Sequence, residues 1–523
     1  MSSTKSHKKS MEKIPPTNDN AYDWLLVLIV SSIILLRVFV ASRIYLDPHE
    51  AFYWLMSKHS DFGIQLEPPL VPTLIYLTTL FGKSVLSVRL VSVLTLPLIS
   101  LMSYKITLDI SGRKWVSLLS VIILNSIPIY MIEGIIMMTE SIALLFWAST
   151  IYCLHMALMS DTRVRWYILG AVIGLDLWAT TLIPLVFTSI LLFMILSGRK
   201  YSSGLGRSLM VMTLLLIPLV YLLIPFDGGF IKHHLVHHVS QSLGFNFNSF
   251  TNLLASQIIS LTPPLFLALM LGTIYGVYTA LKVMDDYPRL LLFCTSALPM
   301  SIFYTTSFVI PIAADWMLMA YFSSSILLAL LIGKIIECHP RYVIGALGCL
   351  SLALIISNYS CWSIIFNIIN PSVAPPSSLN SYFLRYYVDP GLITKLDEET
   401  GDKSTRTDVL LDNKYDYPIV LFNRYETYAT YVIFTRIDAS GTHYWSDYTP
   451  IYYWAMSISN VSNDIIFVAR DQKNAEMIRP YFQSVEYDGK VDVVKGDVIL
   501  RSYFFYRASN RSEGLIDRLR YGF

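Results

Sequence analysis

The chain has 523 residues, of which 54% are hydrophobic and only 15% charged, and its mean hydropathy is +0.53. This composition excludes a soluble globular protein, whose surface requires many more charged side chains. The formal net charge of +2 is small, and the charges are segregated along the chain rather than clustered for nucleic acid, so no nucleic-acid partner is predicted.

Apolar stretches recur from Trp24 to about Ser357, and each is long enough to cross ~30 Å of hydrocarbon as a helix. The stretch at 166–197 is long enough for a broken pair of helices. The sequence therefore predicts a polytopic α-helical membrane protein. The predicted spans are 24–42, 85–108, 115–131, 139–158, 166–197, 208–225, 251–280, 289–309, 316–336 and 341–358.

The loops on the two sides of these spans differ in charge. Basic clusters occur in the N-terminal tail (1–23) and at 111–115, 161–166, 197–207, 281–289 and 333–341. One threading places all of them on the cytoplasmic side, as the positive-inside rule requires. The other loops are acidic, aromatic and histidine-rich, and they face outward: 45–84, 130–140, 226–250 and 310–316.

The composition changes after the last span. We expect a transmembrane domain over 24–360, a Pro/Ser-containing linker over 361–380 and a soluble domain over 381–523. Strand-like runs at 417–422 and 464–470 alternate with a helical stretch at 472–482, which indicates a small α/β domain. The number of spans places this domain outside the cytoplasm.

The cysteines and histidines do not form a strong metal motif. The cysteines lie in or beside apolar segments without CxxC spacing and read as small buried hydrophobes: Cys153, Cys294, Cys338, Cys349 and Cys361. Residues 230–248 contain Lys232 and two i, i+4 histidine pairs, His233–His237 and His234–His238. Metal sites use this histidine spacing. An interfacial helix that meets phosphate, or a solvated surface, is favoured there over a metal site. No cofactor is assigned, and a divalent metal stays an alternative that no strong motif indicates.

The first external loop concentrates titratable and aromatic residues. If "PHEAFYWLM" begins a helix, Tyr53 and Trp54 share one face with Glu50. A carboxylate beside aromatic rings suits a sugar, because the acid accepts a hydroxyl proton while the rings stack on the apolar face of the sugar. The alternative is an interfacial helix with its aromatic residues in the headgroup belt.

Further charged residues lie at the outer ends of apolar spans. Glu140 opens one span and Glu133 precedes it by seven residues; carboxylates at a membrane boundary are costly and usually functional. The alternative for Glu140 is a helix N-terminus, where an acid suits the dipole. Arg89 and the nearby Lys83 are cations that either bind a lipid phosphate or form a structural ion pair.

These motifs resemble, in order and topology, the GT-C superfamily of polyprenyl-phosphate-sugar-dependent glycosyltransferases. The similar branch contains the protein O-mannosyltransferases and the aminoarabinose transferase acting on lipid A. The resemblance rests on "PHEAFYWLMSKHSDFGIQLEPPL", "FGKSVLSVRLVSVL", "SIPIYMIEGIIMMTESIALLFWA" and "ADWMLMAYF". It implies a GT-C-like helical domain with about 10 to 13 transmembrane helices, interfacial helices in the first external loop and the small C-terminal α/β domain.

The resemblance also implies roles for individual residues. Glu50 takes the place of the first-loop catalytic acid, Glu140 that of the second acid and Arg89 that of the arginine near the lipid phosphate. Lys83 and Lys232 are the further candidates for the donor phosphate. The candidates for substrate binding are Tyr53, Trp54, Glu67, Glu133, His234, Asp315 and Trp316. His49 departs from the usual acidic pair, and Glu67 stands where histidine usually precedes the two prolines.

The implied reaction is an inverting transfer of a sugar, with mannose favoured, from a dolichyl- or polyprenyl-phosphate donor to a hydroxyl acceptor of a protein, glycan or lipid. Membrane lipids are the expected surroundings. The expected location is a multi-pass protein of a prokaryotic plasma membrane with an extracytoplasmic active site, and an endoplasmic-reticulum membrane fits the same pattern. The alternatives are a transporter or flippase and a catalytically silent scaffold that binds carbohydrate.

Overall fold

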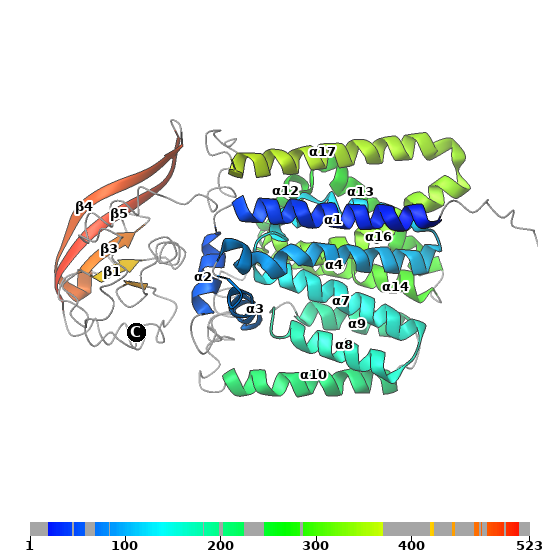
Figure 1. Cartoon of the computed structure of the whole chain (residues 1–523), viewed down its shortest axis with the longest axis horizontal. Coiled ribbons are helices and arrows are strands. Elements are labelled where there is room, and N and C mark those ends of the chain that lie inside the picture. Colours follow the sequence, from blue (N-terminus) through cyan, green and yellow to red (C-terminus); the bar gives the residue numbers. More distant parts are fainter. Residues whose placement is uncertain are drawn as a thin grey trace, which may run out of the picture.

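The computed structural model describes residues 19–43, 46–57, 68–82, 84–180, 183–197, 202–223, 245–282, 286–369, 419–422, 442–444, 465–469, 472, 479–495 and 498–511. Figure 1 shows the long helices running side by side in a bundle, with a β-sheet beyond one end of it. Two short helices, α2 (Pro48–Met56) and α3 (Leu70–Thr79), lie across that end of the bundle.

Each predicted span corresponds to one helix or to two consecutive helices. The remaining helices are α1 (Asp19–Arg43), α4 (Val85–Ser111), α5 (Lys114–Asn125), α6 (Pro128–Glu133), α7 (Thr139–Met159), α8 (Arg163–Asp176), α9 (Ile183–Ser197), α10 (Ser202–Leu223), α12 (Phe247–Leu261), α13 (Pro263–Lys282), α14 (Tyr287–Cys294), α15 (Ala297–Thr306), α16 (Leu318–Cys338) and α17 (Val343–Ile369). In the described part of the chain, seven helices are long and apolar enough to cross a membrane. The prediction of a multi-pass helical membrane protein is confirmed.

Several predicted spans are broken where the local sequence disfavours a continuous helix. Pro128 takes the first position of α6 and separates it from α5, because proline lacks the N–H that a helix interior requires. Between α12 and α13, Thr262 has a φ of +67° and is followed by two prolines. The expected broken pair at 166–197 is confirmed as α8 and α9.

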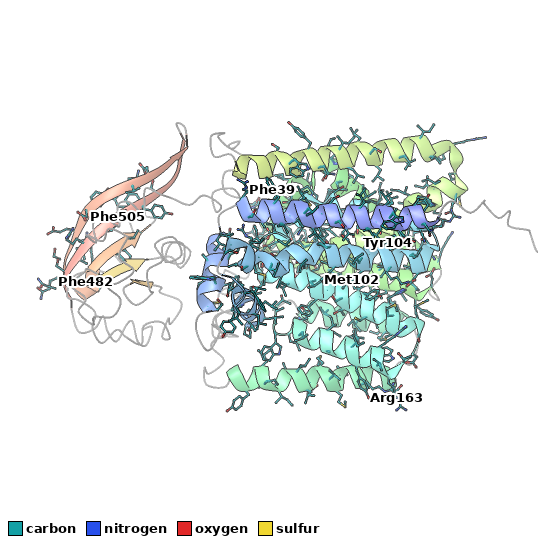
Figure 2. The ribbon with its side chains drawn as sticks, in the orientation of Figure 1. Phe39, Met102, Tyr104, Arg163, Phe482 and Phe505 are labelled. Carbon is teal, nitrogen blue, oxygen red and sulfur yellow. The ribbon has the colours of Figure 1, made fainter. Side chains whose placement is uncertain are left out.

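The outer surface of the bundle is apolar. Phe39 projects from α1 (Figure 2) and is 54% exposed, and Trp24, Leu28 and Leu35 of the same helix are 73%, 62% and 71% exposed. Such a continuous apolar face is unfavourable in water and favourable against lipid. The exposed side chains therefore mark the lipid-facing surface.

Small residues let helices approach closely inside the bundle. Gly272 and Gly276 lie on the side of α13 that faces α16, and a Cβ atom at Gly272 would lie 2.8 Å from the backbone nitrogen of Leu328. The hydroxyl of Thr273, the residue after Gly272, is hydrogen-bonded to that of Ser324 at 2.9 Å. In lipid the hydrophobic effect does not drive helix association, so close packing of small residues and interhelical hydrogen bonds hold α13 against α16.

The C-terminal part forms one five-stranded sheet in the order β2-β1-β3-β5-β4. β1 (Ile419–Phe422) pairs in parallel with β2 (Thr442–Tyr444) and β3 (Ile465–Ala469), whereas β5 (Val498–Arg511) pairs antiparallel with β3 and β4 (Phe482–Lys495). Figure 2 labels Phe482 and Phe505 on this sheet. The two predicted strands match β1 and β3.

Two predicted domain boundaries differ from the helix ends. α1 begins at Asp19, inside the expected N-terminal tail, and α17 continues to Ile369, into the expected linker. Apolar residues continue past Cys361 as "WSIIFNII", which extends the last helix. Of the helical stretch predicted at 472–482, residues 473–478 lie outside the described residues; Arg479–Tyr481 form the short 3-10 helix η9.

Candidate functional site

The first external helix begins with a reciprocal cap. Asp47 precedes α2 and accepts a hydrogen bond from the backbone N–H of His49 at 2.8 Å. Glu50 reaches back and accepts from the backbone N–H of Asp47 at 2.9 Å. With Pro48 at the first helical position, "DPHE" has the form of a capping box, which satisfies otherwise unpaired N–H groups. The sequence therefore fixes the start of α2 and the direction of Glu50 together.

Glu50 forms a buried ion pair with Arg89 of α4. Arg89 donates from Nε to Oε1 at 2.8 Å and from Nη2 to Oε2 at 2.5 Å. Both side chains are 0% exposed. A two-pronged arginine–carboxylate pair is strong and directional, and burial makes either partner costly to leave alone.

The pair also joins two other segments. Arg89 donates from Nη1 to the carbonyl of Ala41 at 3.0 Å, at the end of α1. Oε1 of Glu50 accepts a further bond from the backbone N–H of Met137 at 2.8 Å, in the connection before α7. Both Glu50 oxygens are thus surrounded by donors, and four segments of the chain meet at this ion pair.

The connection between α6 and α7 is not helical, and side chains satisfy its backbone. Arg37 of α1 donates to the carbonyls of Tyr130 and Gly134 at 2.7 and 2.6 Å. Ser92 donates to the carbonyl of Ile135 at 2.8 Å. Irregular backbone at membrane depth requires such partners. Hydrogen bonds from α1 and α4 therefore stabilise this connection in its non-helical conformation.

Three carboxylates gather around this connection. Glu133 ends α6, Glu140 lies in the first turn of α7, and Asp315 lies in the short 3-10 helix η2 (Ala314–Met317). Glu140 interacts electrostatically with both of the others. Glu133 is buried, while Glu140 and Asp315 are half-buried. The fold therefore brings together acids that are far apart in the sequence.

Among the described residues, fewer donors surround the carboxylate of Glu140 than that of Glu50. Its Oε2 accepts a hydrogen bond from the hydroxyl of Thr139 at 3.0 Å, and its own backbone N–H is a second donor. Glu50, by contrast, accepts from the Arg89 guanidinium and from two backbone N–H groups. The two acids predicted for catalysis thus have different surroundings.

A polar network positions η2 and its aspartate. Gln257 of α12 donates to the carbonyl of Ala314 at 2.9 Å and accepts from the hydroxyl of Tyr321 at 2.7 Å. Tyr130 donates its hydroxyl to the carbonyl of Leu318 at 2.6 Å. Because these groups are buried, each hydrogen bond is needed to offset the loss of water.

The predicted aromatic residues occupy different environments. Tyr53 is 5% exposed and belongs to the apolar cluster between α2 and α3, and Trp54 packs half-buried against that cluster. Trp316 is half-buried with its ring 6.1 Å from that of Phe303. Four predicted contacts lie outside the described residues: Glu67, Lys83, Lys232 and His234.

Within the described part of the chain, no group of three or more His, Cys, Asp or Glu residues has the arrangement of a metal site. The described cysteines with placed side chains are free thiols: Cys153, Cys294, Cys338 and Cys349.

Two buried groups at the site were not predicted as site residues. Arg37 is 0% exposed within an apolar span, and an ionisable residue there is a signal that sequence analysis can read. Gln257 is also 0% exposed, but a glutamine near a helix end gives no comparable signal. The "DPHE" capping pattern was equally visible in the sequence.

The comparisons with known proteins agree with this architecture. Residues 66–224 match the family model described as dolichyl-phosphate-mannose-protein mannosyltransferase. No curated protein matches the chain in sequence. The matched segment contains Arg89, Glu133 and Glu140 but not Glu50.

Solved structures of two other proteins share the fold. The crystal structure of ArnT from Cupriavidus metallidurans bound to undecaprenyl phosphate has a TM-score of 0.63 at 12% identity, over 93% of this chain and 98% of that one. The Archaeoglobus fulgidus oligosaccharyltransferase in its apo form has a TM-score of 0.52 at 13% identity, over 95% and 78%. The resemblance predicted from the motifs is therefore confirmed: the chain has the GT-C glycosyltransferase fold and carries a segment of the mannosyltransferase family model.

Proposed function

We propose that the chain is a membrane glycosyltransferase that moves a sugar from a polyprenyl-phosphate donor to a hydroxyl acceptor on the non-cytoplasmic side. The observation that carries the proposal is the likeness to ArnT over 93% of this chain. The family segment at 66–224 supports the same class. The ArnT structure holds undecaprenyl phosphate, which motivates a lipid-phosphate donor here.

The reaction is a single displacement at the anomeric carbon. The acceptor oxygen forms a bond to that carbon while the bond to the donor phosphate oxygen breaks, and the configuration inverts. The hydroxyl proton passes to a carboxylate, and the lipid phosphate leaves. Such a carboxylate needs a free lone pair within hydrogen-bond reach of the acceptor.

The hydrogen bonds around the two acids favour Glu140 as the proton acceptor. Glu50 is fully buried and surrounded by donors, which suits a residue that positions α2 and the α6–α7 connection. Glu140 is half-buried, and among the described residues its carboxylate accepts from Thr139 and from its own backbone N–H. In this proposal Glu50, paired with Arg89, is a positioning residue, whereas the sequence had led us to expect it as the base.

The donor phosphate requires cations that face it. Arg89 directs its guanidinium to Glu50 and to the carbonyl of Ala41. In this arrangement Arg89 positions Glu50 and does not bind the donor phosphate. Lys83 and Lys232 remain the proposed phosphate contacts. A mannose-like sugar is proposed from the family description, and a protein, glycan or lipid hydroxyl is the acceptor.

The test is transfer of labelled mannose by the purified full chain in lipid to a membrane extract. Dolichyl-phosphate and undecaprenyl-phosphate mannose serve as donors. We expect Glu140→Gln to lower the rate by ~10²–10⁴-fold at unchanged thermal stability, as loss of a positioned base does. Glu486→Gln, an exposed residue of β4, is the matched control and should transfer as the wild type does.

The outcomes separate the assignments. A lower rate in Glu50→Gln together with lower thermal stability supports a positioning role. Full loss in Glu50→Gln at unchanged stability, with normal transfer in Glu140→Gln, returns the base role to Glu50. If neither donor supports transfer while sealed vesicles containing the protein take up a lipid-linked sugar, a transporter replaces the proposal.

A further inference from the structure

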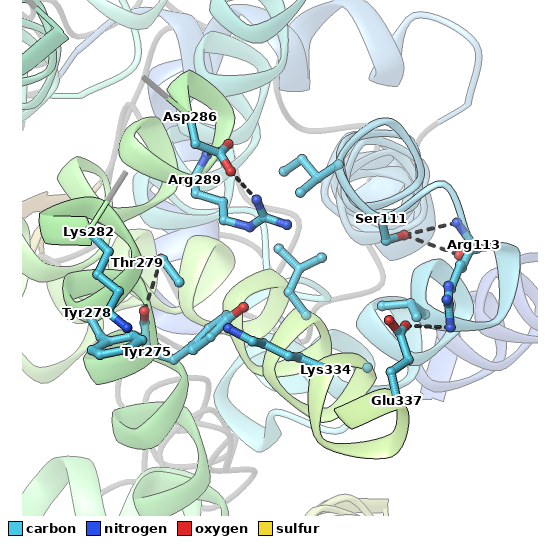
Figure 3. Close-up of a pocket in the computed structure, with 14 residues that line it drawn as sticks. Ser111, Arg113, Tyr275, Tyr278, Thr279, Lys282, Asp286, Arg289, Lys334 and Glu337 are labelled. Carbon is cyan, nitrogen blue, oxygen red and sulfur yellow. Dashed lines mark hydrogen bonds and ion pairs between the residues drawn. The ribbon is translucent and has the colours of Figure 1, made fainter. Parts of the chain in front are cut away.

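A polar cavity lies at the end of the bundle opposite to α2 and α3. It has a volume of about 360 Å³ and is lined by the ends of α4, α13 and α16 and the starts of α5 and α14 (Figure 3). At 1.5 Å per helical residue, Ser111 lies about 33 Å along α4 from Arg89. That distance matches the thickness of the hydrocarbon core, so the cavity and the Glu50 site lie at opposite membrane surfaces.

The cavity faces the cytoplasm on the threading given by the positive-inside rule. Its lining comes from three of the basic loops, at 111–115, 281–289 and 333–341. The described lining contains four cations and two carboxylates: Arg113, Lys282, Arg289 and Lys334 against Asp286 and Glu337. The excess of positive charge is therefore concentrated around a cavity.

Two ion pairs form the walls of the cavity. Arg113 pairs with Glu337 between α5 and α16, and Arg289 pairs with Asp286 at the start of α14. Figure 3 shows these pairs on different sides of the open space. Each pair neutralises itself, so the remaining charge comes from the two lysines.

Neither lysine pairs with a carboxylate of the described residues. Lys282 lies over the ring of Tyr278, with Nζ 4.6 Å from its centroid, and Lys334 lies over Tyr275 at 5.6 Å. Lys282 also donates one hydrogen bond to the hydroxyl of Tyr278, and contact with a ring face leaves the other N–H donors of an ammonium group unused. Both lysines are thus held at the cavity with donors available for an anion.

The start of α5 adds a further anion-attracting group. Arg113 is its N-cap residue and no side chain caps the helix, while Val116 of the first turn lines the cavity. Uncapped N–H groups and the helix dipole both favour an anion. The start of α5 and the ammonium groups of Lys282 and Lys334 therefore border the same space.

The mouth of the cavity continues into a lipid-facing stripe. Tyr278 lines the cavity and belongs to a row of exposed side chains along α13. The exposed fractions are 62% for Leu267, 57% for Leu271, 61% for Ile274, 46% for Tyr278 and 69% for Leu281. This spacing follows one helix face, on which acyl chains would lie below a head group in the cavity.

We propose that this cavity binds the phosphate head group of an anionic lipid from the cytoplasmic leaflet. Lys282, Lys334 and the start of α5 contact the phosphate, and the α13 stripe contacts the acyl chains. Basic pockets between transmembrane helices on the cytoplasmic side have the chemistry for such head groups. The proposal is independent of the transfer reaction at the opposite surface.

The test is a titration of the purified, delipidated full chain with phosphatidylglycerol, followed by native mass spectrometry. Phosphatidylcholine with the same acyl chains is the neutral comparison. We expect the double variant K282Q/K334Q to bind phosphatidylglycerol roughly 10- to 30-fold more weakly, with phosphatidylcholine unchanged. The variant K282R/K334R keeps both charges and should retain most of the binding.

A matched control removes two cations from the same membrane surface outside the cavity. Arg163 and Arg341 are exposed and do not line it, so R163Q/R341Q should bind as the wild type does. Equal weakening in both double variants, or none in K282Q/K334Q, overturns the site. Inorganic phosphate is tested alone by thermal shift and as a competitor. If it stabilises the protein and displaces the lipid completely, a free phosphate replaces the lipid as the ligand.

Discussion

Arg37 and Gly134 meet in a contact that leaves no room for a side chain. Nη1 of Arg37 donates to the carbonyl of Gly134 at 2.6 Å, and a Cβ atom on Gly134 would lie 2.6 Å from that same nitrogen. Arg37 comes from α1 and Gly134 from the connection between α6 and α7. The glycine therefore allows a buried arginine to hold the backbone that leads to Glu140.

Gly134→Ala should destabilise the protein by about 1–3 kcal/mol, because overpacking displaces the Arg37 guanidinium. Thermal unfolding in detergent measures this as a lower transition temperature. Gly345→Ala in α17 is the matched control, since a Cβ atom there meets nothing within 4 Å. An equal transition temperature in Gly134→Ala and the wild type would contradict the contact.

Arg37→Met should destabilise the protein more than an exposed arginine does, because the Tyr130 and Gly134 carbonyls lose their donors. Each unsatisfied buried group costs ~1–3 kcal/mol. Transfer activity should fall as well, since Glu140 follows the released connection. Arg163→Met, at an exposed position, should leave both quantities unchanged. The prediction fails if both variants behave alike.

The pair formed by Glu50 and Arg89 should show strong coupling in a double-mutant cycle. Removing one partner of a buried pair typically costs ~3–5 kcal/mol, because the other charge stays buried and uncompensated. E50Q and R89Q should each lower the transition temperature, and E50Q/R89Q should lower it by less than their sum. Additive effects would mean that the pair is not formed in the membrane.

Gln257→Leu should impair transfer by releasing η2, without changing Lys83 and Lys232, the proposed contacts of the donor phosphate. The substitution removes the bond to the Ala314 carbonyl and the acceptor for the Tyr321 hydroxyl. We expect a lower maximal rate and a free energy of unfolding lowered by about 1–3 kcal/mol, which a lower transition temperature would report. The paired variant Tyr321→Phe loses one of these bonds, so its effect should be smaller.

The two membrane surfaces can be assigned with a membrane-impermeant maleimide. Cys338 is exposed at the end of α16, near the cavity, and should react in intact cells only after permeabilisation. Tyr487→Cys on β4, where Tyr487 is 53% exposed, should react without it when introduced into a chain that lacks other cysteines. Labelling of both from the same side would exclude the proposed threading.

The spans were predictable from the sequence because hydropathy is a local property. A run such as Trp24–Phe39 is apolar whatever the rest of the chain does, and the bilayer then requires a helix. The sidedness of the basic loops is also carried by the sequence. The breaks at Pro128 and Pro263 follow from the missing N–H of proline.

The surroundings of the predicted acids were not predictable, because they depend on residues far apart in the chain. Glu50 and Arg89 are 39 positions apart, and the sequence left open whether Arg89 binds a phosphate or an ion-pair partner. The bundle packing decided between these arrangements in the described state. It also brought Asp315 to Glu140, which no local pattern indicates.

The sequence by itself determined the membrane class, the family resemblance and the charged residues at the ends of the apolar spans. Only the tertiary structure decided which charges neutralise each other and that hydrogen-bond donors surround the carboxylate of Glu50. The physical reason is that hydrophobicity acts on each segment separately, whereas a buried charge is stable only with a partner that the chain path brings within a few ångströms.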